Sequence, residues 1–383
     1  MDISQADERI NGMDENGLLY EKILQDLKDR IRDGKLLPGD RLPTEMELAQ
    51  KFGVSRITSK RALEELRADG IIYRVRGRGS FVADPRQREK AAEKVSGGLN
   101  YKKVIAFVIP FSCTSGGIID TIRGASRVVT EKGYILDIKY SNNNLEEERG
   151  LLRTLYEKGV GGVIFYPISD RKNLEIMNTL SLNEYPMVSI DRYYESIPIS
   201  YVVSDNQKGG YDMTKYLLGL GHRKIAFVSD NRIEDATSVR NRYFGYCKAL
   251  KESGVDIPLE FVKNGDLYGL QKETTIPILR ELLEKGVTAF FCINDYVAIF
   301  VLQCLKSLKI DVPKNVSVTG FDNLDVSGIA YTPLTTVCQD MEKMGEVAAG
   351  YIIESIEKGK CSYMEKTVPV KMVVRESCGR CEK

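Results

Sequence analysis

The sequence is poor in the features that mark membrane, secreted and metal-dependent proteins. It has one histidine, His222, and no run of about 18 apolar residues of the kind that crosses a bilayer. Its first seventeen residues, MDISQADERINGMDENG, are polar and acidic, unlike a signal peptide, so we expect a disordered tail over 1–17. We therefore expect a cytoplasmic protein in which the 8 cysteines are reduced.

The scarcity of histidine also argues against a bound metal. A structural zinc site needs four ligands, whereas Cys378 and Cys381 form a single CxxC pair and the other cysteines are scattered. His222 follows Leu-Gly in a turn before an apolar stretch, which favours a structural role over catalysis. We expect neither a metal nor a cofactor, and a short C-terminal tail over 378–383.

Two helices joined by a short turn are predicted near the N-terminus. Thr44 and Glu47 form a capping box that starts the first helix. Ser55 can cap the second helix, which is basic, and a glycine ends each helix. A short turn between two such helices is typical of a helix-turn-helix.

The elements on either side of these helices complete a DNA-binding domain. Apolar residues recur at helical spacing over 19–31, and apolar and basic residues alternate over 71–82 around a Gly-Arg-Gly tip, which predicts a hairpin. Nine basic and four acidic side chains over 54–88 leave a net charge of +5, against +1 for the whole chain. Gathered positive charge is typical of phosphate binding, and we predict a winged helix-turn-helix domain over 18–83.

The runs over 38–56 and 62–82 resemble the GntR family of bacterial transcription regulators. The resemblance implies that the second helix of the motif enters the major groove and that the hairpin enters the minor groove. Met46 and Lys60 stand where many members carry Arg, so the resemblance does not define the operator sequence. The residues predicted to bind DNA are Glu45, Arg56, Thr58, Lys60, Arg76, Gly77, Arg78 and Gly79.

A larger domain follows a charged and Gly/Ser-rich stretch over 84–101, which we predict to be a linker. Over 102–377, short apolar strands alternate with amphipathic helices, a pattern that indicates parallel sheets covered on both faces. The predicted fold class is therefore α/β, with a small winged helix-turn-helix domain and a two-lobed parallel-sheet effector domain. No Gly-x-Gly-x-x-Gly follows the first strand, which disfavours dinucleotide binding.

Polar residues follow many of the predicted strands. Ligands of open α/β sheets bind at the carboxyl ends of the strands, so we expect these residues to surround a ligand. The set is neutral and acidic with few bases, which suits a polyhydroxylated ligand better than a nucleotide polyphosphate. Its members are Ser112, Thr114, Tyr166, Ser169, Asp191, Arg192, Asp205, Asn206, Asn294, Asp295, Asp322 and Asn323.

Three stretches, over 202–254, 289–298 and 312–340, resemble the effector domain of the LacI/GalR regulators, which itself resembles periplasmic sugar-binding proteins. The resemblance implies that Arg242 binds a sugar and that Asp295 accepts hydrogen bonds from the hydroxyl groups of that sugar. A GntR-type head on a LacI-type body is most similar to the arabinose-responsive repressors. The residues predicted to bind the effector are Arg242, Asp295, Tyr166, Ser112, Ser169, Tyr268 and Gln339.

These features together predict a transcription regulator rather than an enzyme. We expect a homodimer on palindromic double-stranded DNA, acting as a repressor that a small sugar releases, with L-arabinose implied by the resemblance. An activator, or a regulator with another pentose, hexose or nucleoside effector, has the same sequence features. A GntR-type head also occurs on pyridoxal-phosphate enzymes, but here the LacI-like stretches occupy that part of the chain. The basic N-terminal domain also disfavours a sugar hydrolase or a transport binding protein, since neither function needs a DNA-binding domain.

Overall fold

The computed structural model describes residues 20, 22–68, 71–75, 78–83, 100–111, 116–265, 267 and 269–381. The chain divides into two compact units, Met1–Leu99 and Asn100–Lys383. The tail predicted over 1–17 and most of the linker predicted over 84–101 fall outside the described residues.

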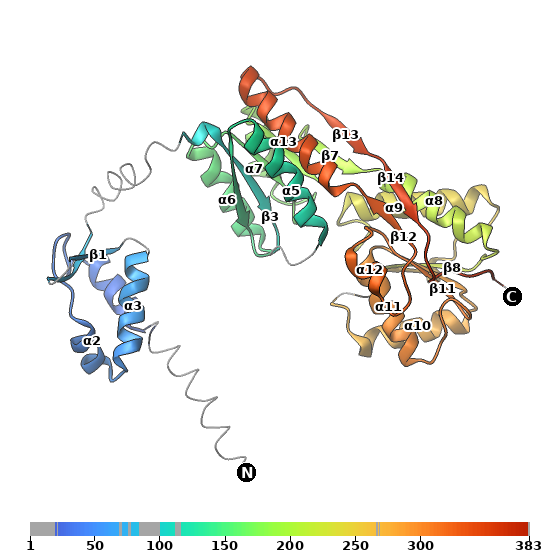
Figure 1. Cartoon of the computed structure of the whole chain (residues 1–383), viewed down its shortest axis with the longest axis horizontal. Helices are drawn as coiled ribbons and strands as arrows, with labels where there is room; N and C mark the ends of the chain where they lie inside the picture. The colour runs from blue at the N-terminus through green and yellow to red at the C-terminus, as the bar shows by residue number, and fades with distance from the viewer. Residues whose placement is uncertain are drawn as a thin grey trace, which may run out of the picture. The chain divides into compact units, whose positions relative to one another are not determined.

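The N-terminal unit has the winged helix-turn-helix order that the sequence predicts (Figure 1). Its elements are a helix over 22–32, α2 (Glu45–Phe52), α3 (Arg56–Ala68), and an antiparallel hairpin of β1 (Ile72–Val75) and β2 (Gly79–Val82). The capping box is confirmed, since Glu47 N donates to Thr44 Oγ1 at 3.2 Å and Thr44 N donates to the Glu47 carboxylate at 2.7 Å. Every element contributes to one apolar core, in which the most buried side chains include Ile23, Leu27, Leu48, Leu66 and Val82.

The first lobe of the larger unit carries a six-stranded parallel sheet in the order β13-β7-β6-β5-β3-β4. Its elements are a 3-10 turn (Tyr101–Lys103), β3 (Val104–Ile109), α5 (Gly116–Glu131), β4 (Ile135–Tyr140), α6 (Leu145–Glu157), β5 (Gly162–Phe165), α7 (Leu174–Leu182), β6 (Met187–Ile190), β7 (Ser200–Ser204), α13 (Met341–Lys358) and β13 (Glu365–Val368). Ile105 and Phe107 of β3 pack with α5 and α13, whereas Ala106 and Val108 pack with α6 and α7. Successive strand residues face opposite sides of a sheet, so β3 is apolar throughout because both of its faces are covered.

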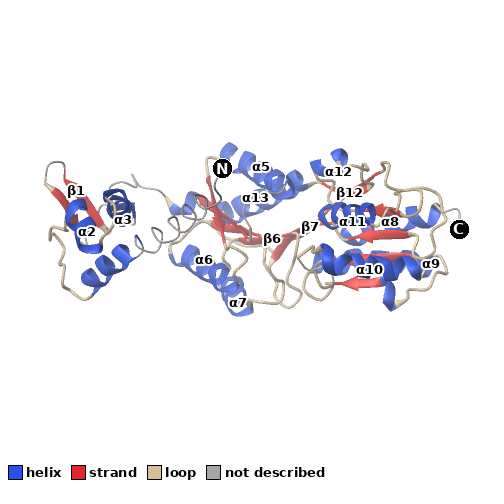
Figure 2. Ribbon diagram, turned by 90° about the horizontal axis from the view of Figure 1, so that it is seen from below, coloured by secondary structure: helices blue, strands red, loops and turns tan. Residues whose placement is uncertain are grey.

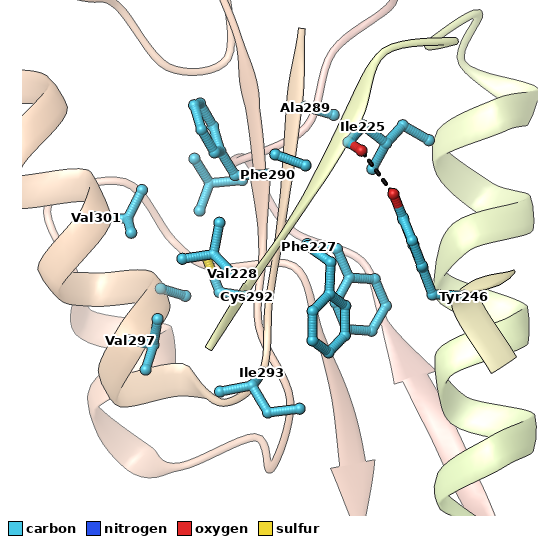
Figure 3. Close-up of a cluster of buried hydrophobic side chains, with 14 of the residues drawn as sticks. Ile225, Phe227, Val228, Tyr246, Ala289, Phe290, Cys292, Ile293, Val297 and Val301 are labelled. Carbon is cyan, nitrogen blue, oxygen red and sulfur yellow. Dashed lines mark hydrogen bonds between the residues drawn. The ribbon is translucent and has the colours of Figure 1, made fainter. Parts of the chain in front are cut away.

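The second lobe carries a four-stranded parallel sheet in the order β11-β10-β8-β9. Its elements are α8 (Asn206–Gly219), β8 (Ile225–Ser229), α9 (Thr237–Glu252), a 3-10 turn (Leu259–Phe261), β9 (Val262–Asn264), α10 (Lys272–Glu284), β10 (Ala289–Cys292), α11 (Asp295–Ser307), β11 (Ser317–Thr319) and α12 (Asp325–Ile329). Figure 3 shows its core, with Val297 and Val301 of α11 on one side of the strands and Tyr246 of α9 on the other. The buried Tyr246 hydroxyl donates to the Ile225 carbonyl at 2.8 Å, which satisfies its one polar atom.

The chain passes between these two lobes three times (Figure 2). It leaves the first lobe between β7 and α8, and it returns between β12 (Thr336–Gln339) and α13. It crosses again between β13 and β14 (Val370–Val373), which pairs antiparallel with β12. The predicted two-lobed α/β fold is thus confirmed, and Asp205 at the first crossing caps α8 by accepting from Lys208 N at 3.0 Å.

Glycines allow one pair of helices in each lobe to pack with their backbones in contact. A Cβ atom at Gly345 of α13 would overlap the Thr121 carbonyl of α5, and one at Gly124 of α5 would overlap the Glu342 carbonyl of α13. In the second lobe, Gly210 of α8 lies against the carbonyl of Arg242 in α9. These positions accept no side chain without separating the helices.

The residues predicted as a C-terminal tail are instead part of the second lobe as far as Cys381. Gly379 N donates to Ser317 Oγ at 3.1 Å, and Cys381 N donates to the Leu220 carbonyl at 2.8 Å. His222 has the structural role that the sequence favours, with its ring nitrogens 3.0 Å from Thr288 Oγ1 and 2.9 Å from Ser317 Oγ. Burial lowers the pKa of this imidazole, which favours the neutral ring.

Among the described residues, no helix has both the length and the apolar composition needed to cross a membrane. No three His, Cys, Asp or Glu side chains in this part of the chain gather closely enough to hold a metal ion.

The substitution Gly345→Ala is expected to lower the free energy of unfolding by about 1–3 kcal/mol, because the added methyl group forces α5 and α13 apart. Gly350→Ala in the same helix is the matched control, since no heavy atom lies within 4 Å of a Cβ at that position. The control should gain up to about 1 kcal/mol from helix propensity. Urea unfolding of both full-length variants measures the difference, and equal effects would contradict this account of the helix contact.

Candidate functional site

The start of α3 carries two exposed basic side chains in the N-terminal unit. Arg56 and Lys60 have side chains that are 73% and 53% exposed. Thr58 between them is 8% exposed, its amide donates to Ser55 Oγ at 3.1 Å, and the two hydroxyl groups are 2.8 Å apart. Thr58 therefore belongs to the helix cap, while Arg56 and Lys60 extend from the surface.

Glu45 at the start of α2 lies between two arginines. One carboxylate oxygen is 3.3 Å from Arg56 Nε, and the other is 3.1 Å from Arg74 Nη2 of the hairpin. The Glu45 side chain is only 12% exposed, because the ion pairs with Arg56 and Arg74 cover its carboxylate. The predicted DNA residue Glu45 is thus placed to orient two guanidinium groups.

The hairpin contains the remaining predicted DNA residues. Arg78 is exposed at the turn. Gly79 has a φ of 109°, and a Cβ atom there would lie 3.1 Å from Arg41 Nε, so glycine suits both the backbone and the space. Arg76 and Gly77 fall outside the described residues.

A cavity of about 410 Å³ lies between the two lobes of the larger unit. In the first lobe, Tyr166 and Asp191 come directly after β5 and β6. In the second lobe, Asn231, Asn294 and Asp322 follow β8, β10 and β11. The carboxyl ends of both sheets therefore meet at this cavity, where the sequence predicts a ligand.

Arg242 of α9 is the central cation of this cavity. Its Nε donates to Asn206 Oδ1 at 2.8 Å, and its Nη1 donates to the Ile293 carbonyl at 2.7 Å. Its Nη2 lies 3.5 Å from Asp322 Oδ1, and the guanidinium carbon is 3.8 Å from the centre of the Phe321 ring. The side chain is held on several sides, so its remaining N–H groups face the cavity in a defined orientation.

Asp322 supplies a carboxylate beside Arg242. Burial raises its pKa to about 7, although the Arg242 charge acts in the opposite direction. Gln339 Nε2 donates to Asp322 Oδ1 at 2.6 Å, while the buried Gln339 Oε1 has no partner among the described residues. Asp322 has a φ of 111°, in a region of backbone conformation that non-glycine residues rarely adopt.

Aromatic and basic side chains form the opposite wall of the cavity. The rings of Phe111 and Tyr166 meet edge to face at 5.7 Å, and the Arg192 guanidinium lies 5.4 Å from the Tyr166 ring centre. Arg192 Nη1 donates to the Ile168 carbonyl at 2.6 Å, and its buried Nε lies 3.7 Å from the Asp191 carboxylate, with no hydrogen-bond partner in the described structure. The cavity therefore offers flat apolar ring surfaces, cationic hydrogen-bond donors from arginines, and hydrogen-bond acceptors from aspartates.

The lobes also contact each other beside the cavity. The α9 helix begins after Ala236, whose side chain cannot cap it, and Asp170 of the first lobe caps it instead by accepting from Thr237 N at 2.5 Å. Ser238 Oγ donates to Asp191 at 3.2 Å, which joins the next residue of α9 to the end of β6. These hydrogen bonds connect the two lobes along one edge of the cavity.

The structure brings only part of the predicted effector set to the cavity. Arg242, Tyr166 and Gln339 line it. Asp295 is fully buried outside it, where its carboxylate accepts from Leu324 N, Ser327 Oγ and Thr336 Oγ1 at 2.5–2.8 Å. Ser169 also lies outside the lining, and its Oγ accepts from Arg171 N at 3.2 Å. Ser112 and Tyr268 fall outside the described residues.

Asp295 therefore does not have the position that the family resemblance implies. Its hydrogen bonds hold the loop after β11, which carries Asp322 into the cavity. Asp191, Arg192 and Asp322 line the cavity but were predicted only as strand-end residues, and Asn231 and Tyr296 were not predicted at all. Asn231 could have been predicted from the sequence, since it too follows a buried strand, β8, and ligands bind at the carboxyl ends of such strands.

The two units match different family models. Residues 19–82 match the bacterial regulatory proteins of the gntR family, and residues 214–378 match the periplasmic binding protein-like domain. A LacI-type transcriptional regulator from Bacillus cereus subsp. cytotoxis is a similar solved structure, with a TM-score of 0.65, 26% identity, and coverage of 73% of this chain and 99% of that chain. The complex of the transcriptional regulator CelR with cellobiose has a TM-score of 0.64 at 25% identity and covers 88% and 100% of the two chains.

Curated relatives match the chain across both of its units. The arabinose metabolism transcriptional repressor of Geobacillus stearothermophilus is 30% identical over 349 residues, which cover 88% of this chain and 91% of that protein. This match extends over both units of the chain and confirms the prediction of a DNA-binding regulator rather than an enzyme. The chain belongs to the family of GntR-headed transcriptional repressors that includes the arabinose metabolism repressor of Geobacillus stearothermophilus.

Proposed function

We propose that this repressor acts in the cytoplasm as a homodimer on a palindromic operator and is released when a small sugar binds between its lobes. The observation that carries the proposal is the cavity in which Arg242, Asp322 and Gln339 converge opposite the Tyr166 ring. Guanidinium, amide and carboxylate groups recognise hydroxyl groups, and aromatic rings pack on the C–H faces of a sugar.

Two relatives support a sugar as the effector. The repressor of Geobacillus stearothermophilus is described as acting in arabinose metabolism, and the CelR structure contains cellobiose. L-arabinose is our first candidate, since the arabinose metabolism repressor matches this chain over both units. The cavity of about 410 Å³ is within the usual size range of small-molecule sites.

In the proposed mechanism, effector binding and operator binding are coupled because the two lobes have an open and a closed arrangement. A ligand that contacts both lobes favours their closed arrangement over the open one. If closure disfavours the dimer geometry that binds DNA, a coupling of about 1–3 kcal/mol changes operator affinity by about 5–150-fold. In a dimer, each α3 would enter a major groove about one DNA turn from the other.

In the N-terminal unit, Arg56→Ala is expected to weaken operator binding by about 1–3 kcal/mol, because the variant lacks the guanidinium that would contact a base edge. Lys60→Ala should weaken binding to all sequences and lower the salt dependence by about one counterion, as expected for a phosphate contact. Arg67→Ala, at the exposed last turn of α3, is the matched control. Fluorescence anisotropy on a DNA site selected from a random library measures all three, and an equal loss with Arg67→Ala would argue against the assigned surface.

For the effector cavity, Arg242→Ala is expected to keep operator binding and to abolish release by the sugar, because the ligand loses its main cationic donor. Lys251→Ala, on the exposed last turn of α9, is the control and should release normally. Operator release is measured by adding pentoses and hexoses to the protein–DNA complex, with circular dichroism to verify folding. Normal release of the folded Arg242→Ala variant would show that the effector binds elsewhere.

The raised pKa of Asp322, about 7, predicts a pH-dependent effector affinity. A ligand hydroxyl that donates to this group favours the ionised carboxylate, so affinity should be highest above pH 7. Below that value it should fall by up to about tenfold per pH unit as the group takes up a proton. Isothermal titration calorimetry across this range tests the effect, and Asp322→Asn should bind more weakly with little pH dependence. A wild-type affinity that does not change with pH would exclude Asp322 as the acceptor.

A further inference from the structure

A second cavity, of about 420 Å³, lies on the first lobe. It shares no lining residue with the effector cavity. Its walls include four tyrosines, Tyr193, Tyr194, Tyr201 and Tyr363, and two glutamates, Glu195 and Glu365. The family assignment and the proposed sugar response leave this cavity without a role.

The backbone arrangement explains why these side chains converge. Tyr201 of β7 and Glu365 of β13 are register partners in parallel strands, so their side chains lie on the same face of the sheet. Tyr363 is two residues before Glu365, and its hydroxyl donates to the Glu365 carboxylate at 2.7 Å. Tyr193, from the loop after β6, stacks on Tyr201 with a ring-centre distance of 4.4 Å and an interplanar angle of 20°. The rings are thus held in place, and Tyr363 remains 54% exposed.

The charge in this cavity is negative. No Lys or Arg is among the described residues that line it, and no ion pair of Glu365 is found in the described part of the chain. Glu195 does have a partner, since Arg240 of α9 lies 2.9 Å from its carboxylate. Burial and the neighbouring Glu365 carboxylate both raise the pKa of the Tyr201 hydroxyl, consistent with a negative potential.

We propose that this cavity binds a small organic cation, with an alkylammonium group placed against the tyrosine rings and the Glu365 carboxylate. The faces of aromatic rings attract cations, and a carboxylate without a basic partner adds a direct charge interaction. The cavity is larger than a bare inorganic ion requires, and its rings offer apolar contact to the methyl or methylene groups of an organic one.

The test uses the full-length chain and two probes of nearly the same shape, choline and its uncharged carbon analogue 3,3-dimethyl-1-butanol. Isothermal titration calorimetry at constant ionic strength should detect choline at one site per chain. The neutral analogue should bind at least about tenfold more weakly, because it lacks the charge that the rings and the carboxylate attract. Absence of choline binding at millimolar concentration, or equal binding of the two probes, would overturn the proposal.

Variants of exposed residues locate the site without disturbing the core. Glu365→Gln should weaken choline binding by about tenfold and Tyr363→Leu by about fivefold, whereas Tyr363→Phe keeps the ring face and should bind like wild type. Tyr331→Leu in the second lobe is the matched control, since Tyr331 is also an exposed tyrosine at 83%. Choline affinity that is unchanged in Glu365→Gln and Tyr363→Leu, or reduced equally in Tyr331→Leu, would place the cation elsewhere.

Discussion

The effector cavity depends on how one buried arginine is held. Arg242 reaches from α9 to Asn206 of α8, to the carbonyl at the end of β10, and to Asp322 after β11. A buried guanidinium is stable only where hydrogen bonds and a counter-charge replace water. These contacts therefore fix the relative positions of two helices and two strand ends, and with them the polar groups that a ligand meets.

The close packing of α8 on α9 makes this arrangement possible. Gly210 and Gly245 let the two backbones touch, and the Arg242 carbonyl itself lies against Gly210. This proximity places Arg242 Nε within 2.8 Å of Asn206. The α5–α13 pair in the first lobe uses Gly124 and Gly345 in the same way. Each lobe thus has one helix pair in direct backbone contact, the kind of packing expected where a ligand acts on the angle between two lobes.

Two aspartates with similar sequence contexts have different roles. Asp295 and Asp322 each follow a buried strand of the second lobe, and both have pKa values raised by burial. The carboxylate of Asp295 is fully used by Leu324, Ser327 and Thr336, so it positions a loop. Asp322 sits on that loop, faces the cavity, and keeps oxygen lone pairs for a ligand. The aspartate that the family resemblance emphasised therefore supports the one that lines the site.

The sequence was sufficient to predict the local features of this protein. The capping box at Thr44, the glycine that ends α2, and the alternation of buried strands with helices all depend on residues within about four positions of each other. It also determined that polar residues gather at strand ends. The tertiary structure was needed to show which of them line the cavity and that Arg242 of α9 joins them, because Arg242 and Asp322 are 80 residues apart in the sequence. It alone showed the tyrosine cavity, since the register of β13 on β7 brings Glu365 beside Tyr201.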